Sequence, residues 1–170
     1  MAVSDMEALR VLDLLTRVGA DPWIAGGWGV DALTERQTRV HRDLDVMVRA
    51  DRLDAVIAAL RADGLTVSTD ELPVRVELDD GIRVVDVHPV HDDGAGGWWQ
   101  AAPDGGRYAY PAGSVVGGLL GGRTVLCASP DLQRRSHEGY PLRDVDRHDL
   151  ALLDGMLAEP DDDPGWDNGT

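Results

Sequence analysis

Two aspartates separated by a single residue, Asp43 and Asp45, form the pair with the clearest chemical potential in this chain. They alternate with apolar residues, a pattern that predicts a β-strand on which both carboxylates project from one face. Asp86 lies in a second apolar stretch, residues 84–88, and can add a third carboxylate from a neighbouring strand. Carboxylates suit Mg²⁺ or Mn²⁺, and two such ions can neutralise a triphosphate and activate a hydroxyl. We therefore expect Asp43, Asp45 and Asp86 to hold two Mg²⁺ ions.

A glycine pair, Gly26-Gly27, follows the short apolar run of residues 23–25. We expect a strand, a turn and then a helix beginning near Gly29. Backbone N–H groups approach phosphate closely at glycines, and the positive end of a helix favours anions. Taken alone, Asp-x-Asp also occurs in solvated turns and Gly-Gly in ordinary turns. The regular strand around Asp43 favours a metal site, because two carboxylates on one strand face need a counter-charge.

The remaining periodicity predicts the elements that must position these residues. Ser4 and Glu7 form a capping box at the start of the first helix, and Asp79-Asp80-Gly81 is a hairpin turn. The pattern predicts an α+β fold, a mixed sheet flanked by helices, with its sheet core at about residues 20–90 of one domain, residues 1–158. The predicted helices cover residues 4–18, 29–33, 53–60, 130–138 and 144–157; the strands cover 23–25, 44–48, 74–78, 82–88 and 124–128; a long loop or irregular hairpin covers 91–106.

Charge and composition narrow the classes of function. The chain has 31 acidic and 16 basic residues, a net charge of −15, and no lysine. An acidic protein is a poor partner for nucleic acid, and the missing lysine excludes a Walker-type phosphate loop and Schiff-base chemistry. No apolar run reaches the ~20 residues that cross a membrane, so we expect a cytoplasmic protein. Residues 159–170 are predicted to form an acidic disordered tail. Cys127 is expected to be a small buried residue.

The sequence resembles a known enzyme family in several stretches. Residues 23–33, containing Gly26-Gly27-Trp28, and residues 38–46, containing Arg39 and His41, resemble the signature of the antibiotic nucleotidyltransferases that modify aminoglycosides and lincosamides. Those enzymes belong to the DNA polymerase beta superfamily. Further similarity lies in residues 85–89, 137–140 and 146–150. Trp28 stands where the wider superfamily usually has serine, which favours the antibiotic-modifying branch.

The resemblance implies a polymerase-beta-like nucleotidyltransferase fold and a division of roles. Asp43 and Asp45 would ligate both metals, and Asp86 would ligate the catalytic metal and take the proton of the acceptor hydroxyl. The co-substrate would be a nucleoside triphosphate, with ATP expected. Arg39 and His41 have a plainer interpretation, as a loop arginine and a capping histidine. The residues expected to bind nucleotide are Gly26, Gly27, Trp28, Arg39 and His41.

Acceptor binding is predicted for five residues. An aminoglycoside carries several ammonium groups that acidic residues can bind, whereas a lincosamide has more apolar surface for aromatic walls. The acidic composition favours the aminoglycoside. His88 can orient substrate or Asp86, or it can be a core histidine. The predicted acceptor-binding residues are His88, Glu77, Asp92, Trp98 and Trp99.

The sequence also fits other functions. A related enzyme can modify a protein, a tRNA end or another small molecule, although the net charge disfavours tRNA. A non-catalytic nucleotide or antibiotic binder is a further alternative, but it has no need of a carboxylate cluster. His137 and Tyr140 are interpreted as a helix end packed by an aromatic ring. The chain can be a monomer or a homodimer.

Overall fold

A computed structural model describes residues 2–158, so the predicted acidic tail lies outside the described residues. Ser4 caps the first helix and forms the predicted capping box with Glu7. No helix within residues 2–158 is long and apolar enough to cross a membrane. The elements are α1 (Asp5–Arg17), β1 (Trp23–Ile24), α2 (Gly26–Thr34), β2 (Leu44–Arg49), a 3₁₀ turn η1 (Ala50–Arg52), α3 (Leu53–Ala62), β3 (Thr66–Glu71), β4 (Arg75–Asp79), β5 (Val84–Asp92), β6 (Trp98–Ala101), β7 (Arg107–Tyr110), β8 (Val115–Leu120), β9 (Arg123–Ala128), α4 (Pro130–Arg135) and α5 (Asp144–Ala158).

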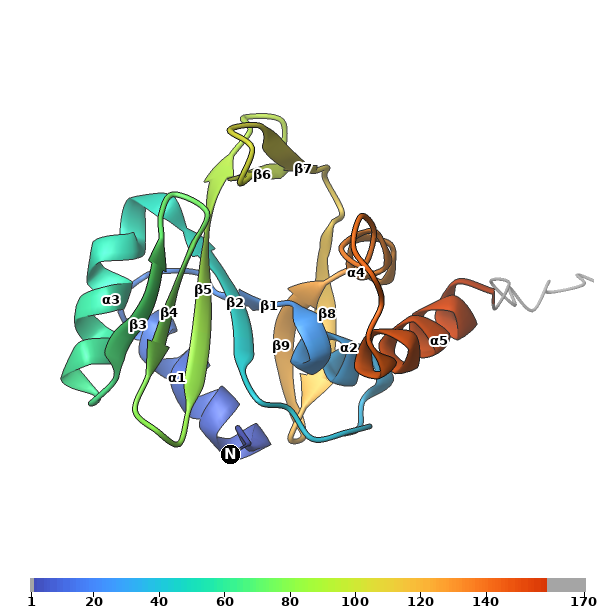
Figure 1. Ribbon diagram of the computed structural model, residues 1–170, viewed down its shortest axis with the longest axis horizontal. Helices are drawn as coiled ribbons and strands as arrows, with labels where there is room; N and C mark the ends of the chain where they lie inside the picture. Colours follow the sequence, from blue (N-terminus) through green and yellow to red (C-terminus); the bar gives the residue numbers. More distant parts are fainter. Residues whose placement is uncertain (1, 159–170) are drawn as a thin grey trace, which may run out of the picture.

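The described strands form one mixed sheet of nine, in the order β3-β4-β5-β2-β1-β9-β8 with the β6–β7 hairpin continuing from β5. β2 runs parallel to β5 and β1 parallel to β9, while the other pairs are antiparallel. Figure 1 shows α1 and α3 beside the β3–β4 end of the sheet and α2, α4 and α5 beside β8 and β9. The predicted α+β fold, a mixed sheet flanked by helices, is confirmed.

The two faces of the sheet have different cores. Residues alternate along β2, so Val46 faces a large apolar cluster formed with α1, α2 and α3, while Met47 faces a smaller one. The smaller cluster contains Trp23 and, from α4, Leu132. The face of Met47 is therefore only partly covered by apolar side chains, and it is the face on which the polar residues of β2 and β5 lie.

The structure extends the predicted elements in three places. Helix α2 begins at Gly26 and not at Gly29; the extended Ala25 precedes it, and Gly26 takes a left-handed φ of 56° that glycine adopts without strain. The sheet continues past the expected core of residues 20–90 through β6 to β9. β3, β7 and β8 were not predicted; β3 has no apolar alternation and β8 contains Gly117-Gly118. The stretch 91–106 forms the hairpin alternative: His91 pairs with Trp99 across β5 and β6.

Candidate active site

Two neighbouring parallel strands build one wall of the site, which we call the sheet wall. Asp45 on β2 lies opposite Asp86 on β5 in the strand register, so both side chains leave the same face. His88 follows Asp86 by two residues and projects from that face too. Ligand atoms of Asp45, Asp86 and His88 all lie within 4.8 Å of one another. The strand register therefore gathers two carboxylates and an imidazole without help from a loop.

Asp86 is the more enclosed of the two carboxylates, with a side chain 12% exposed against 31% for Asp45. Its Oδ2 accepts a hydrogen bond of 2.7 Å from Nη1 of Arg75. Its Oδ1 is buried and has no hydrogen-bond partner among the described residues. Burial raises the pKa of Asp86, and the Asp45 carboxylate adds to this effect, while His88 and Arg75 oppose it. Such a carboxylate can take a proton or bind a cation.

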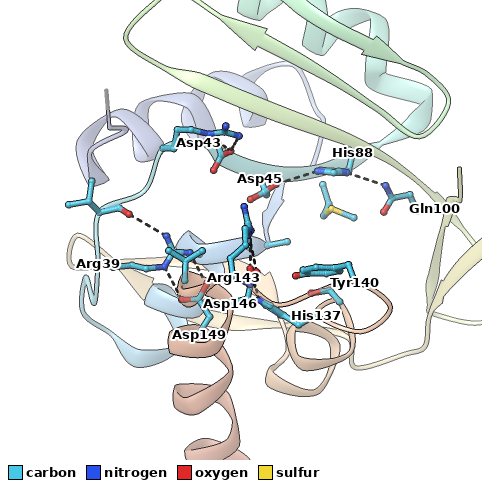
Figure 2. A pocket seen from close by; sticks show the side chains of 18 of the residues that line it. Arg39, Asp43, Asp45, His88, Gln100, His137, Tyr140, Arg143, Asp146 and Asp149 are labelled. Carbon is cyan, nitrogen blue, oxygen red and sulfur yellow. Dashed lines mark hydrogen bonds and ion pairs between the residues drawn. The ribbon is translucent and has the colours of Figure 1, made fainter.

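Asp43 lies just before β2 and lines the same cleft as Asp45 (Figure 2). Its Oδ2 accepts hydrogen bonds of 3.2 and 2.7 Å from Nε and Nη2 of Arg42. In the part of the chain that the structure describes, the group within 4.8 Å contains Asp45, Asp86 and His88 but not Asp43. The structure thus brings together two of the three predicted metal ligands and leaves Asp43 paired with an arginine.

His88 connects the carboxylates to a buried amide. Its Nε2 lies 3.5 Å from Asp45 Oδ1 and 3.7 Å from Asp86 Oδ2. Its Nδ1 lies 3.1 Å from Nε2 of Gln100. Burial disfavours a charged imidazole, but the Asp45 and Asp86 carboxylates outweigh it and raise the pKa of His88. The ring is therefore part of the polar site and not of the apolar core.

The opposite wall, which we call the helix wall, begins at the N-terminus of α2. A Cβ added at Gly27 would overlap Nη2 of Arg39 and Nδ1 of His41, so the guanidinium and the imidazole lie directly over this glycine. The N–H groups in the first turn of a helix have no intrahelical partners, and the helix dipole favours an anion there. The predicted phosphate-binding features therefore do meet at one place.

Two acids of α5 hold the arginines of the helix wall (Figure 2). Arg39 donates to Asp149 through Nε at 2.9 Å and Nη2 at 2.7 Å. Arg143 donates to Asp146 through Nε and Nη2, both at 2.9 Å. Both acids are 2% exposed. Hydrogen bonds from Arg143 lower the pKa of Asp146 to about 2, and the bond to Asp149 raises the pKa of Arg39. Both arginines therefore stay charged and fixed in direction.

Trp28 and His41, predicted to bind nucleotide, are buried, at 1% and 2% exposure. Their rings pack against each other at a tilt of 40° with centroids 4.3 Å apart, and Nε2 of His41 pairs with the Asp31 carboxylate. Among residues 2–158, neither side chain is found in the lining of the cleft. The Trp28 indole therefore supports the helix wall from behind, and direct contact with nucleotide does not fit its position.

The two walls enclose a cleft of about 550 Å³, and a second cavity of about 640 Å³ adjoins it. The first is lined by Gly26 and Gly27, the arginines of the helix wall, Asp43 and Asp45. The second lies between the β6–β7 hairpin, β4 and α4. Both cavities share the same dividing residues, which are His88, Gln100, Tyr110, Ser136 and Tyr140. The arrangement offers two ligand sites that meet at the sheet wall.

A family model described as aminoglycoside-2''-adenylyltransferase matches residues 7–153. The chain belongs to the antibiotic nucleotidyltransferase family. A lincosamide resistance protein from Staphylococcus haemolyticus is 33% identical over 152 residues, 89% of this chain and 94% of the relative. A 2''-aminoglycoside nucleotidyltransferase from Klebsiella pneumoniae is 32% identical over 111 residues, 63% of this chain and 57% of the relative.

Solved structures support the same assignment and the nucleotidyltransferase fold. The lincomycin-bound lincosamide antibiotic adenylyltransferase LnuA superposes with a TM-score of 0.83 at 32% identity, covering 92% of this chain and 99% of that one. The complex of ANT(2'')-Ia with adenylyl-2''-tobramycin gives a TM-score of 0.72 at 21% identity, covering 90% and 88%. The predicted membership of the family, the fold and the enzyme class are thereby confirmed.

Most of the predicted acceptor residues of this nucleotidyltransferase lie outside the cavities. His88 lines both. Glu77 lies beside Asp86 in the strand register, but its Oε1 accepts a hydrogen bond from Ser68. Asp92 is exposed at the end of β5, Trp98 packs against the smaller apolar cluster, and Trp99 stacks between His91 and Arg107. In the described residues, these four are missing from the lining of both cavities.

Several residues that shape the nucleotidyltransferase site carried no usable sequence signal. Gln100 and Tyr110 lie on the β6–β7 hairpin, whose first strand was predicted only as part of a loop or irregular hairpin. Arg75 reaches Asp86 because β4 pairs with β5. Arg143 precedes α5, donates a hydrogen bond to Asp146 and lines the cleft. The contacts of Gln100, Tyr110 and Arg75 depend on tertiary pairing, whereas Arg143 and Asp146 are only three residues apart.

Proposed function

We propose that this enzyme transfers AMP from ATP, with Mg²⁺, to a hydroxyl group of a lincosamide-type antibiotic. The observation that carries the proposal is the junction of two cavities at His88, whose imidazole lies beside Asp45 and Asp86. One cavity has the charges that a triphosphate needs, and the other has the size and lining of a drug-sized site. A donor and an acceptor bound in these cavities would meet at the two carboxylates.

The first cavity suits the triphosphate. Gly27 leaves room beneath the guanidinium of Arg39, and Arg143 adds a second cation. The planar fork of arginine matches phosphate oxygens, and these two forks are already held by Asp149 and Asp146. Holding the cations before the ligand arrives lowers the entropy that binding must overcome.

The carboxylates suit Mg²⁺. Asp45 and Asp86 lie side by side on adjacent strands, and Oδ1 of Asp86 is buried without a hydrogen-bond partner among residues 2–158. A buried carboxylate oxygen of this kind is costly unless a cation or a donor reaches it. Asp43, which lines the same cleft, would complete the ligand set by releasing Arg42. When bound, the metal supplies charge neutralisation of the triphosphate and of the pyrophosphate that leaves.

Asp86 is the proposed general base. Its raised pKa makes it a better proton acceptor than an exposed aspartate, and its free Oδ1 can receive the proton of the acceptor hydroxyl. Arg75 holds the other oxygen and so fixes the direction of the carboxylate. The pair would therefore leave one defined oxygen of Asp86 for the proton. Among the described residues, Asp86 itself lines neither cavity but lies beside Arg75 and His88, which line the second.

The second cavity favours a lincosamide over an aminoglycoside. Its charged residues are three arginines, Arg75, Arg107 and Arg135, against two glutamates, Glu71 and Glu138, which is a poor site for a polycation. Its remaining lining is rich in aromatic and apolar side chains, including Val74, Pro103, Tyr108, Tyr110, Leu132 and Tyr140. The charge argument for an aminoglycoside loses its basis because Glu77 and Asp92 lie elsewhere. The aromatic and apolar side chains of the second cavity instead offer walls for an apolar acceptor.

Mass spectrometry of reaction mixtures tests the proposal. The protein is incubated with Mg²⁺, each nucleoside triphosphate in turn, and lincomycin or tobramycin, with Asp45→Asn as the matched inactive control. We expect an adenylyl adduct on lincomycin that requires ATP and Mg²⁺. An adduct on tobramycin alone would overturn the acceptor, a nucleotide on the protein itself would indicate a protein substrate, and no adduct under any condition would overturn the reaction.

A further inference from the structure

A chain of buried hydrogen bonds crosses the wall that the two cavities share. The Tyr110 hydroxyl donates to Oε1 of Gln100 at 2.5 Å. Nε2 of Gln100 donates to the Val74 carbonyl at 3.0 Å and lies 3.1 Å from Nδ1 of His88. Gln100 is only 5% exposed, so its amide has few other partners available. The network links β7, β6 and the residue preceding β4 to the histidine beside the carboxylates.

The partners of Gln100 decide which way its amide faces. A backbone carbonyl can only accept a hydrogen bond, so the Val74 oxygen requires the amide nitrogen and not the amide oxygen. The amide oxygen in turn accepts the phenol proton, and burial keeps that proton in place by raising the pKa of Tyr110 to about 12. The second amide hydrogen therefore points at Nδ1 of His88.

This amide hydrogen fixes the state of the His88 ring. Nδ1 must offer a lone pair to Gln100, so the proton of the neutral imidazole resides on Nε2. Nε2 faces Asp45 and Asp86, whose carboxylates favour a proton at that atom. The amide on one side and the carboxylates on the other therefore select the same tautomer. A protonated Nε2 has no lone pair for a metal ion.

We propose that Gln100 is a positioning residue that fixes the proton of His88 on Nε2, making His88 a hydrogen-bond donor at the junction of the cavities and not a metal ligand. The inference rests on the proposed function for its consequence in catalysis. Nε2 lies 3.5 Å from Oδ1 of Asp45 and 3.7 Å from Oδ2 of Asp86, so a slightly closer approach in the loaded enzyme would complete a hydrogen bond from Nε2 to one of these carboxylates. His88 would then hold that carboxylate in place from the side opposite Gln100.

Nitrogen NMR of histidine-labelled protein tests the tautomer directly, before any substrate is added. The protonated ring nitrogen gives a pyrrole-type signal and the other a pyridine-type signal, and a His88→Gln sample identifies the His88 pair among the five histidines. We expect a pyrrole-type Nε2 and a pyridine-type Nδ1, unchanged on adding Mg²⁺ and ATP. A pyrrole-type Nδ1, or loss of the Nε2 proton when Mg²⁺ is added, would overturn the proposal.

Two variants connect the tautomer to the reaction. Gln100→Glu places a carboxylate against Nδ1, so we expect the proton at Nδ1 and at least a tenfold lower kcat with a KM for ATP within about twofold of wild type. Gln100→Met keeps the volume without the donor and should give mixed signals and a smaller loss. Thr124→Glu adds the same charge on the exposed side of β9 and is the matched control.

The outcomes separate this proposal from the proposed function. An unshifted His88 signal in Gln100→Glu and Gln100→Met, or a shifted signal with an unchanged kcat, would overturn the role of Gln100. If wild-type protein shows the expected tautomer but transfers no nucleotide to any acceptor, the proposed function fails while the assignment of the tautomer stands. Should Gln100→Glu not fold, the wild-type and Gln100→Met spectra still decide.

Discussion

The sheet wall and the helix wall use the same residue type, aspartate, in opposite ways. On the sheet wall, Asp45 and Asp86 stand opposite each other, and one oxygen of Asp86 has no hydrogen-bond partner among the described residues. On the helix wall, Asp146 and Asp149 are each bound through two hydrogen bonds from an arginine side chain. Asp45 and Asp86 are available to bind cations, whereas Asp146 and Asp149 orient the protein's own arginine side chains. The partner of an aspartate therefore decides its role in this cleft.

The largest effect is expected from breaking the sheet wall. Asp45→Asn should abolish transfer, because it removes a ligand charge beside the reacting phosphate. Asp86→Asn should lower the single-turnover rate by at least about a hundredfold, while ATP binding measured by calorimetry largely survives, since general-base catalysis contributes about 10²- to 10⁴-fold. Near-normal turnover of Asp45→Asn would contradict the metal site, and lost affinity with a normal rate at saturation would make Asp86 a binding ligand only.

A smaller, different effect is expected from the helix wall. Asp149→Asn leaves Arg39 charged but no longer held by two charged bonds, so we expect a KM for ATP about tenfold higher with a modest change in kcat. Arg39→Ala should raise the KM at least as much, and the double variant should add little to it because the two residues act as a unit. Steady-state kinetics measures all three. A change in kcat alone would indicate that Asp149 acts in the chemical step, as proposed for the sheet wall, and not in binding ATP.

The smallest effect concerns stability at low pH. The folded pKa of Asp146, about 2, lies below its usual value of 3.8 because Arg143 donates to it, so its contribution is complete above pH 4 and is lost as the pH falls towards 2. Arg143 is largely exposed, which reduces the contribution to about 1 kcal/mol. Asp146→Asn should therefore lower the free energy of unfolding by urea at pH 7 and lose this difference near pH 2.

Asp80 offers a matched control for that measurement. Its pKa is also lowered to about 2, because hydrogen bonds from Arg83 and Ile82 outweigh burial, and it lies on the β4–β5 turn at a distance from the cleft. Asp80→Asn should show a similar pH dependence of stability with a normal KM for ATP. If Asp146→Asn and Asp80→Asn raise the KM for ATP equally, the change in KM comes from lost stability and not from a role of Asp146 in the helix wall.

The alternation of apolar and polar residues predicted the two strands that carry the site, but it did not predict which strands lie next to each other. The alternation around Asp45 and the apolar stretch around Asp86 predicted β2 and β5, because a two-residue period is a property of the strand itself. That β2 runs parallel to β5, which places Asp45 opposite Asp86, depends on the order of strands in the sheet. Asp43 shows the same limit: its spacing matches Asp45, but the adjacent Arg42 takes its carboxylate.

The helix wall and the acceptor cavity required the tertiary structure. Arg39 and its partner Asp149 are separated by 110 residues, and nothing in either segment alone indicates the other. The net charge of −15 suggested a cationic acceptor, but total charge does not say where charges lie. Glu77, for instance, bonds to Ser68. The aromatic lining of the second cavity combines Tyr108 and Tyr110 of the β6–β7 hairpin with Tyr140, and the sequence does not indicate that these segments meet.

Cys127 gives the sheet a built-in chemical reporter. The thiol is fully buried on β9, where its partner across the sheet is Ile24 of the two-residue strand β1, and β1 joins β9 to β2. Burial raises the pKa of the thiol to about 11, so a thiol-reactive dye cannot label it while the strands remain closed. The labelling rate at neutral pH therefore measures how often β1 and β9 separate. Bound nucleotide that contacts both walls of the cleft should lower this rate.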